Sequence, residues 1–581
     1  MGSNSRPDDG FDNFERFLEQ WSRRAFLRRM GAAAAYTAFL AGGLEFAAAC
    51  ANAGGGQRAP QVSAVKGGKI IEGSISDIAS VTPLNSINSG DTTSSQIITL
   101  LGDGLLDLKD NGDLIPSLAT EVPKPSADQL TYTFKLRDAK WSDGKTISAD
   151  DVVFTYRLMF APEFKDVVSR YQADMTEYMQ SVEAPDQKTV VFKMKKVWAA
   201  FLDSYARLKI QPKHVLGSLA PKAYNTADFF SNPTVTSGPF KFVKWDKGQQ
   251  VVLGRNESYW RGAPNLDQYI LKVVTDAVVL AQQLKTGELD VGQPDASQWD
   301  NLATASSITR KKFVTPSFVY YGFNLDPAKP QSKMFGDKTV RKALQYALDR
   351  ESMAKAVYFG QAVPGDAVLP SVNWAYNQNL KSHYPFDKKK AEQLLDQAGW
   401  QKGADGIRAK GDVKLKFEMN TNAGNKVREN LLTVMQQQWK EIGVEASPRP
   451  IQFQQLVTQL RSIRTFDVFL LGIAFGDTDP DERNLFTTSG IGGTGLNGMN
   501  YKNPDVDKFM DDALATTDRT KRKELYGKIQ DILADELPAP ILFYPNSLWG
   551  INKRVVGWNV GPYNTYQARP WIKDTFVTDG K

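Results

Sequence analysis

Apolar and polar residues alternate in short stretches of the first half of the chain. Residues 131–136 carry an apolar side chain at every second position, which predicts a half-buried strand. The pair Asp143-Gly144 then predicts a tight turn, and Ser148 predicts the N-cap of a helix that begins at Ala149. Further strands are predicted in residues 68–74, 238–243, 250–255 and 266–274.

From Phe313 onward the pattern changes to a regular alternation of helix and strand. Asp337 can cap a helix with one apolar face, and a second helix is expected between Asp387 and Gly399, where the glycine suits a left-handed helix end. Further helices are predicted in residues 426–442 and 504–535, and strands in residues 466–473 and 541–544. This alternation is typical of an α/β lobe.

Several of these segments resemble one protein family. Residues 131–156 closely resemble the signature of the family 5 extracellular solute-binding proteins, which are the peptide, nickel and oligosaccharide receptors of ABC importers. Further blocks follow in the family's order from about Gly67 to the C-terminus, at residues 236–242, 255–260, 284–290, 337–350 and 391–400. On these blocks the chain is identified as a member of the family.

The resemblance implies an α/β fold of the type II periplasmic-binding-protein class, with two lobes, a hinge and a small inserted third domain. We place lobe I in residues 67–105, 236–312 and 540–581, the inserted domain in residues 106–235, and lobe II in residues 313–539. In this family the lobes close over the ligand, so that binding and domain motion are one event. The length agrees, because the roughly 530 residues after the first 50 are too many for one hydrophobic core.

Residues 1–50 have the layout of a twin-arginine export signal. Arg23 and Arg24 precede an apolar run, residues 31–49, that is rich in Ala and Gly. The alternative is a single membrane anchor, but the run is poor in Leu, Ile and Val and contains Glu45. We therefore expect export to the periplasm or the outer face of the cytoplasmic membrane.

Cys50 follows the apolar run and is the only cysteine in the chain. It can be the lipidated residue of a bacterial lipoprotein, although Ala47 stands where such signals usually have Leu. The small residues at 47–49 and 51–53 also fit ordinary signal cleavage, so both routes stay open. Residues 51–66 predict a flexible spacer. Because no second cysteine exists, packing rather than disulfides must stabilise the fold.

Charge and composition exclude nucleic acid as a partner. The net charge of +6 comes from 71 basic and 65 acidic residues, and no basic run is interleaved with aromatic residues. With 41% hydrophobic residues the chain has ample core material. We expect a monomer.

Motifs for catalysis are incomplete. Residues 490–495 match the glycine pattern of dinucleotide-binding folds, but the following residues predict a loop instead of the required helix. Gly144-Lys145-Thr146 lacks the first glycine of a P-loop, and His214 and His383, the only histidines, have no metal-ligand spacing. We expect no cofactor, no metal and no enzyme activity. A secreted hydrolase with paired carboxylates is the alternative, and turnover of the ligand would reveal it.

The strongest candidate for ligand binding is the loop after the apolar strand at residues 466–473. It contains Phe475, Gly476, Asp477 and Asp479, and it leaves a strand end, where α/β folds place ligand sites. The loop resembles the family segment that supplies an aspartate to the free amino group of a peptide. Asp477 is the best match, and Asp479 is the alternative because the loop is one residue shorter than in dipeptide receptors.

Six further residues are candidate ligand contacts. Tyr320, Tyr321 and Asn324 lie just after the first crossing between the lobes, a region where family members commonly contact ligand. Trp374 and Tyr376 offer aromatic faces for a side chain or a sugar ring, and Asn88 offers a polar group from the first loop. Core packing or surface exposure is the alternative for each of these residues.

The sequence thus predicts an exported receptor that captures a solute and presents it to an ABC permease. The family resemblance makes a peptide the first expectation for the ligand. An oligosaccharide is the alternative, because 12 Trp and 20 Tyr residues supply stacking surfaces. Amine recognition by Asp477 and stacking by Trp374 are the features that separate these two ligand classes.

Overall fold

The structure is a computed structural model that describes residues 63–79, 82–474, 478–492, 495–566 and 568–580. Arg23, Arg24, Cys50 and spacer residues 51–62 lie outside the described residues. The same is true of Phe475, Gly476 and Asp477. None of the helices formed by the described residues is long and apolar enough to cross a membrane.

A mixed sheet of twelve strands organises the residues from 65 onward. Its main path, in spatial order, is β18 (Glu445–Ile451), β17 (Lys416–Asn422), β19 (Val468–Ala474), β12 (Ser317–Phe323), β20 (Ile541–Asn552), β10 (Val291–Gly292), β1 (Lys69–Ser74), β9 (Gln268–Val273), β8 (Gln250–Arg255) and β7 (Phe240–Asp246). Two more strands, β11 (Ile308–Val314) and β13 (Ala362–Pro364), pair with β20.

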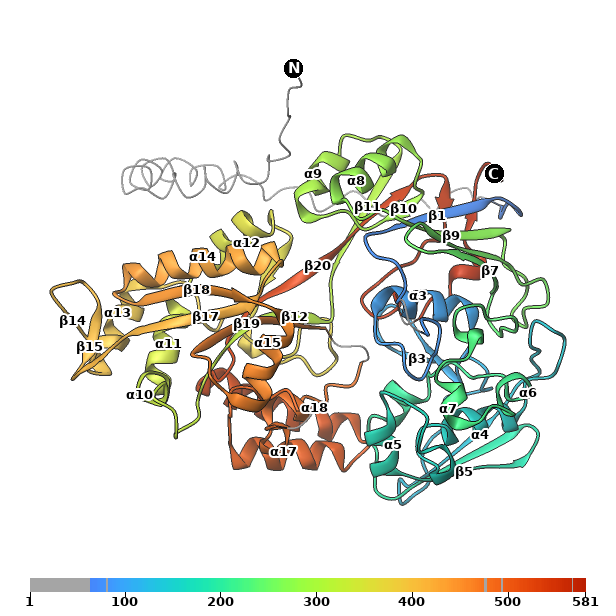
Figure 1. Cartoon of the computed structure of the whole chain (residues 1–581), viewed down its shortest axis with the longest axis horizontal. Coiled ribbons are helices and arrows are strands. Elements are labelled where there is room, and N and C mark those ends of the chain that lie inside the picture. The colour runs from blue at the N-terminus through green and yellow to red at the C-terminus, as the bar shows by residue number, and fades with distance from the viewer. Residues whose placement is uncertain (1–62, 80–81, 475–477, 493–494, 567, 581) are drawn as a thin grey trace, which may run out of the picture. The chain divides into compact units, whose positions relative to one another are not determined.

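Strand β20 connects the two halves of this sheet (Figure 1). Its first residues pair with β12 and β13, and its residues from Asn546 onward pair with β11 and β10. The change of partner falls just after Pro545, which has no backbone N–H to donate to a ladder. The strand expected at residues 541–544 is therefore confirmed but continues to Asn552.

The half of the sheet that contains β1, β8 and β9 packs against α3 (Thr92–Leu101) and the C-terminal segment. Its buried core includes Ile70, Leu100, Tyr269 and Trp549. Glu72 and Arg569 form a buried ion pair at 2.8 Å within this core.

Residues between β1 and β7 in the sequence form a separate three-stranded sheet. It has the order β4 (Thr131–Lys135), β6 (Thr189–Met194) and β5 (Met179–Asp186), with α4 (Ala149–Arg157) and α5 (Gln172–Tyr178) beside it. Strand β4 and the start of α4 after Ser148 confirm the sequence predictions. Trp141, Phe134, Tyr156 and Phe192 belong to the buried cluster that these elements share with residues 87–235.

The remaining half consists of β12, β17, β18 and β19 with helices packed around them. These helices include α11 (Lys338–Tyr346), α13 (Lys388–Gln397), α14 (Lys426–Glu441), α17 (Pro504–Leu514) and α18 (Arg519–Glu536). Asp337 and Asp387 cap α11 and α13 as predicted, and Gly399 has a positive φ of 83°. The helical structure expected at residues 504–535 is confirmed, but it is divided into two helices, and Asp518 caps the second.

The α/β fold with a large mixed sheet confirms the predicted fold class.

Candidate functional site

The segment that follows Asp477 is anchored on two sides. Thr478 donates its hydroxyl hydrogen to Oδ1 of Asp203 at 2.7 Å, and Asp203 belongs to the η3 segment Phe201–Tyr205. The carbonyl oxygen of Thr478 accepts a hydrogen bond from Nε1 of Trp374 at 3.0 Å. Both contacts hold Thr478, one residue after Asp477, which itself lies outside the described residues.

Asp479 is committed to a buried ion pair. Its carboxylate lies 2.8 Å from the guanidinium of Arg522 in α18, and the side chains are 1% and 4% exposed. Burial opposes the charge of Arg522, but Asp479 and Tyr526 together outweigh it, so the pKa of Arg522 is raised. In this conformation the charge of Asp479 is therefore neutralised within the protein, and Asp477 stays the prediction for recognition of an amine.

The ring of Trp374 is covered by other side chains. The Arg519 guanidinium lies over it at 4.6 Å, that of Arg522 at 5.6 Å, and Tyr526 meets it edge-on at 6.2 Å. This packing and the hydrogen bond to Thr478 hold the indole against residue 478, and a ligand role for Trp374 stays a prediction. Tyr376 is half-buried and packs against the cluster of Ala367, Leu380 and Ala534.

Three candidates on β12 and just after it are engaged with the protein interior. Tyr320 packs between Phe318 and Phe469, and burial raises its pKa. Tyr321 is fully buried and donates its hydroxyl hydrogen to Oε1 of Gln345 at 2.9 Å. The Nδ2 of Asn324 donates to the carbonyl oxygen of Phe466 at 2.8 Å. These contacts hold the three side chains within the protein interior around β12, and a ligand role for them stays a prediction.

Asn88 lies in a different part of the fold. It is half-buried in the loop before α3, and its backbone N–H donates to the carbonyl oxygen of Asn85 at 3.1 Å. The neighbouring Ile87 belongs to the buried cluster around the three-stranded sheet. The structure therefore places Trp374 against the segment after β19, to which Asp479 belongs. Asn88 instead lies in the loop before α3, which packs against the half of the sheet that contains β1.

Arg428 is a half-buried cation beside β19 that is absent from the residues predicted from the sequence. Its guanidinium lies against the backbone of β19, because a Cβ on Gly472 would be 3.1 Å from Nη2 of Arg428. Arg428 donates to Oδ1 of Asn422, and no carboxylate of a described residue forms a salt bridge with it. Burial lowers its pKa. Gly472 lies two residues before the end of β19, so this cation is close to the start of the Asp477 loop.

A signal for Arg428 existed in the sequence. It occupies the first turn of α14, after the N-cap Asn425, and its backbone N–H donates to that side chain at 3.0 Å. The N-terminus of a helix carries a partial positive charge, which disfavours a cation in the first turn. An arginine at this position therefore indicates that its guanidinium interacts with a group outside the helix.

Helices α17 and α18 lie next to α5 in Figure 1. Among the described residues, three hydrogen-bonded contacts join the segment 478–517 to the segment 129–203, and we call them the bridging contacts. The first is the bond between Thr478 and Asp203. In the second, Arg483 donates to the Tyr178 hydroxyl at 2.5 Å and lies 3.8 Å from Asp174. In the third, the backbone N–H and the hydroxyl of Thr517 both donate to Oε1 of Gln129 at 2.8 Å.

The bridging contact at Arg483 is electrostatically well matched. Burial opposes the charge of Arg483, but Asp481, Tyr178 and Asp174 favour it, and its pKa is raised. Asp481 lies 2.9 Å from Nε of Arg483 and belongs to the same segment. Among the described residues no group of three or more His, Cys, Asp or Glu side chains could hold a metal ion.

Comparison with known proteins gives consistent matches along most of the chain. The family described as bacterial extracellular solute-binding proteins, family 5 Middle, matches residues 113–493. The oligopeptide-binding protein AppA of Bacillus subtilis is 33% identical over 541 residues, which cover 90% of this chain and 96% of AppA.

Solved structures show the same similarity in three dimensions. AppA from Bacillus subtilis, in complex with a nonapeptide, has a TM-score of 0.72 at 31% identity and covers 88% of this chain and 99% of its own. NikZ from Campylobacter jejuni, in complex with Ni(L-His), has a TM-score of 0.70 at 28% identity, with coverage of 85% and 96%.

Proposed function

This chain belongs to family 5 of the bacterial extracellular solute-binding proteins, and from this membership we propose that it is the peptide-binding receptor of an ABC importer. The observation that carries the proposal is the 33% identity to the oligopeptide-binding protein AppA along 90% of the chain. The receptor captures a peptide, presents it to the permease and releases it chemically unchanged. No catalytic step on the ligand is part of this function.

The charges around the loop after β19 support a zwitterionic ligand. Asp477 is the proposed acceptor for the free amino group of the peptide. Arg428, which lies against β19 without a carboxylate partner among the described residues, is the proposed donor to an acidic group of the ligand. A hydrogen bond between charged groups contributes about 1.5 to 3 kcal/mol, which corresponds to roughly 10- to 100-fold in affinity.

The bridging contacts support closure over the ligand. Two of them link Thr478 and Arg483, which follow the proposed amine site, to Asp203 and Tyr178 near the three-stranded sheet. A ligand held at Asp477 and these contacts would therefore stabilise the same closed arrangement. In this proposal lobe I comprises residues 67–105, 236–312 and 540–581, the inserted domain residues 106–235, and lobe II residues 313–539. The separate buried clusters around the three-stranded sheet, β12 and β1 support this division.

Export completes the proposal. The family is extracellular, and we propose that Arg23 and Arg24 direct the chain through the twin-arginine route and that Cys50 carries a lipid anchor. The spacer at residues 51–66 would then let a monomeric receptor reach the permease. An oligosaccharide ligand is less well supported, because the ring of Trp374 is covered by Arg519 and Arg522.

A thermal-shift screen of the mature chain tests the function. Free peptides of two to nine residues would be compared with cello-oligosaccharides and with a nickel–histidine complex. A ligand at about 100 times its Kd stabilises the native state by about 2.7 kcal/mol, so a peptide should raise the Tm measurably. A shift with the oligosaccharides or the nickel complex alone would overturn the proposal.

A further inference from the structure

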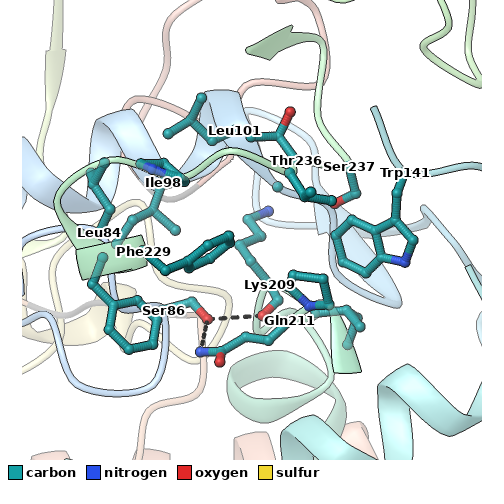
Figure 2. A pocket seen from close by; sticks show the side chains of 16 residues that line it. Leu84, Ser86, Ile98, Leu101, Trp141, Lys209, Gln211, Phe229, Thr236 and Ser237 are labelled. Carbon is teal, nitrogen blue, oxygen red and sulfur yellow. Dashed lines mark hydrogen bonds between the residues drawn. The ribbon is translucent and has the colours of Figure 1, made fainter. Parts of the chain in front are cut away.

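A pocket away from the proposed peptide site contains an unpaired lysine. It lies where α3 meets residues 209–212 and 229–237, and its volume is about 50 Å³. Leu84, Ile98, Leu101, Trp141 and Phe229 form apolar walls (Figure 2). Lys209 extends into the space that these side chains enclose. None of the residues proposed to bind peptide lines this pocket.

Lys209 is buried without a counter-charge in contact. The residue is 8% exposed, and its ammonium group forms no hydrogen bond or salt bridge with any residue that the structure describes. The aliphatic stem of Lys209 accounts for this burial, and its ammonium nitrogen is not enclosed, so it faces the open space of the pocket. Its backbone is fixed, since its carbonyl oxygen accepts from the Ser86 hydroxyl at 2.9 Å, and the Gln211 amide donates to the Ser86 oxygen at 3.1 Å.

The nearby carboxylate of Asp103 is used elsewhere. One of its oxygens accepts from Nε1 of Trp260 at 2.8 Å, and the other accepts from the Tyr259 hydroxyl at 3.3 Å. Burial raises the pKa of Asp103, and Arg261 opposes this shift more strongly than Lys209 does. Among the described residues Asp103 forms no salt bridge with Lys209, so the ammonium group of Lys209 stays available to a ligand.

The hydroxyl groups in the pocket add one further donor. Ser86 and Thr236 give their hydrogens to the carbonyl oxygens of Lys209 and Phe240. The oxygen of Ser237 accepts from the backbone N–H of Asp103 at 2.9 Å, and its own hydrogen is donated to no residue in the described part of the chain. The pocket therefore offers one cation and one hydroxyl donor, and its other walls are mainly apolar.

We propose that this pocket binds a short-chain monocarboxylate, with its carboxylate on Lys209 and Ser237 and its hydrocarbon part against Ile98, Leu101 and Phe229. The volume holds roughly three to five water-sized groups, which fits a carboxylate of two to three carbons such as propionate. A phosphate group would need more donors than these two, and chloride would leave the apolar walls without contacts. The site is a second ligand site, independent of peptide binding.

Calorimetric titration with sodium propionate, at an ionic strength held constant with sodium chloride, tests the site. We expect Lys209→Met to weaken propionate binding by at least about 10-fold, because it removes the charged donor and keeps the length of the side chain. Lys222→Met, at an exposed lysine of α7 (Pro221–Tyr224), is the matched control and should leave the affinity unchanged. Propionamide, which has no charge, should bind the wild type at least about 10-fold more weakly than propionate.

Two further measurements keep the result decisive. Gly102→Ala would place a Cβ 3.1 Å from Cβ of Lys209, so it should also weaken propionate binding if Lys209→Met fails to fold. In crystals soaked with 3-bromopropionate, the bromine anomalous peak should lie in the pocket of the wild type. The proposal is overturned if propionamide binds as tightly as propionate, or if Lys209→Met or Gly102→Ala keeps wild-type affinity. Peptide affinity should not change in either variant, which separates this result from the proposed function.

Discussion

Removal of the Tyr178 hydroxyl should open the receptor without damage to either lobe. Tyr178 stacks on Trp198 at 5.0 Å, and Arg483 donates to its hydroxyl at 2.5 Å. Tyr178→Phe keeps the ring and its packing but removes the acceptor for Arg483. In the proposed open form Arg483 keeps its 2.9 Å contact with Asp481 in its own segment, so we expect the loss to fall on the proposed closed form.

The magnitude follows from the type of bond. A hydrogen bond from a charged donor contributes about 1.5 to 3 kcal/mol, and the partly exposed ion pair of Arg483 with Asp174 at 3.8 Å adds at most about 1 kcal/mol. Because water replaces the lost acceptor in part, we expect the equilibrium between closed and open forms to shift by about 1 to 2 kcal/mol. Peptide affinity should then fall by roughly 5- to 30-fold, mostly through faster dissociation.

Stopped-flow and calorimetric measurements with a peptide from the screen provide the assay. Tyr178→Phe should raise the dissociation rate and leave the Tm of the free protein nearly unchanged. In a double-mutant cycle with Arg483→Met the two effects should not add, because both substitutions remove the same bond. Tyr346→Phe is the control, since the Tyr346 hydroxyl donates to no described residue. Unchanged dissociation in Tyr178→Phe, or full additivity in the cycle, would refute the role of this contact.

Three more predictions concern single charges. Arg428→Gln should weaken binding of a dipeptide by roughly 10- to 100-fold while the Tm stays within about 2 °C, and unchanged affinity measured by calorimetry would rule out its role. Asp479→Asn should destabilise the protein by about 3 to 5 kcal/mol in urea unfolding because it leaves Arg522 buried without its counter-charge, and a smaller loss than about 1 kcal/mol would contradict this. Burial raises the pKa of Asp103 above 3.8, so the folded protein binds this proton more tightly than the unfolded chain does, and its contribution to stability is lost as the pH rises from 3.8 through the folded pKa. Asp103→Asn should flatten the pH dependence of unfolding in that range, and an unaltered profile would argue against the shift.

Local rules explain which parts of the fold could be predicted. The strand at β4 and the helix starts after Ser148, Asp337 and Asp387 depend on periodicity and on caps a few residues away, and the structure has them where expected. The break between α17 and α18 was missed because neither Gly nor Pro marks it and apolar residues continue on both sides. Only the N-cap Asp518 signals the second helix.

The contacts of the candidate site could not be predicted from sequence patterns, because they join residues far apart in the chain. Asp479 and Arg522 are 43 positions apart, and Trp374 meets Thr478 across 104 positions, so neither pairing has a local signature. The sequence therefore left Asp479 open as a ligand residue and Trp374 open as a stacking surface. The structure engages both side chains with protein groups, and it adds Arg428 to the residues near the loop.

The affinity ratio between a free peptide and its N-acetylated form is the most direct test of amine recognition by this receptor. The wild type should bind the free peptide roughly 10- to 100-fold more tightly, because acetylation removes the charge that Asp477 is proposed to accept. In Asp477→Asn the ratio should fall close to one. Equal binding of both forms by the wild type, or an unaltered ratio in Asp477→Asn, would contradict the account.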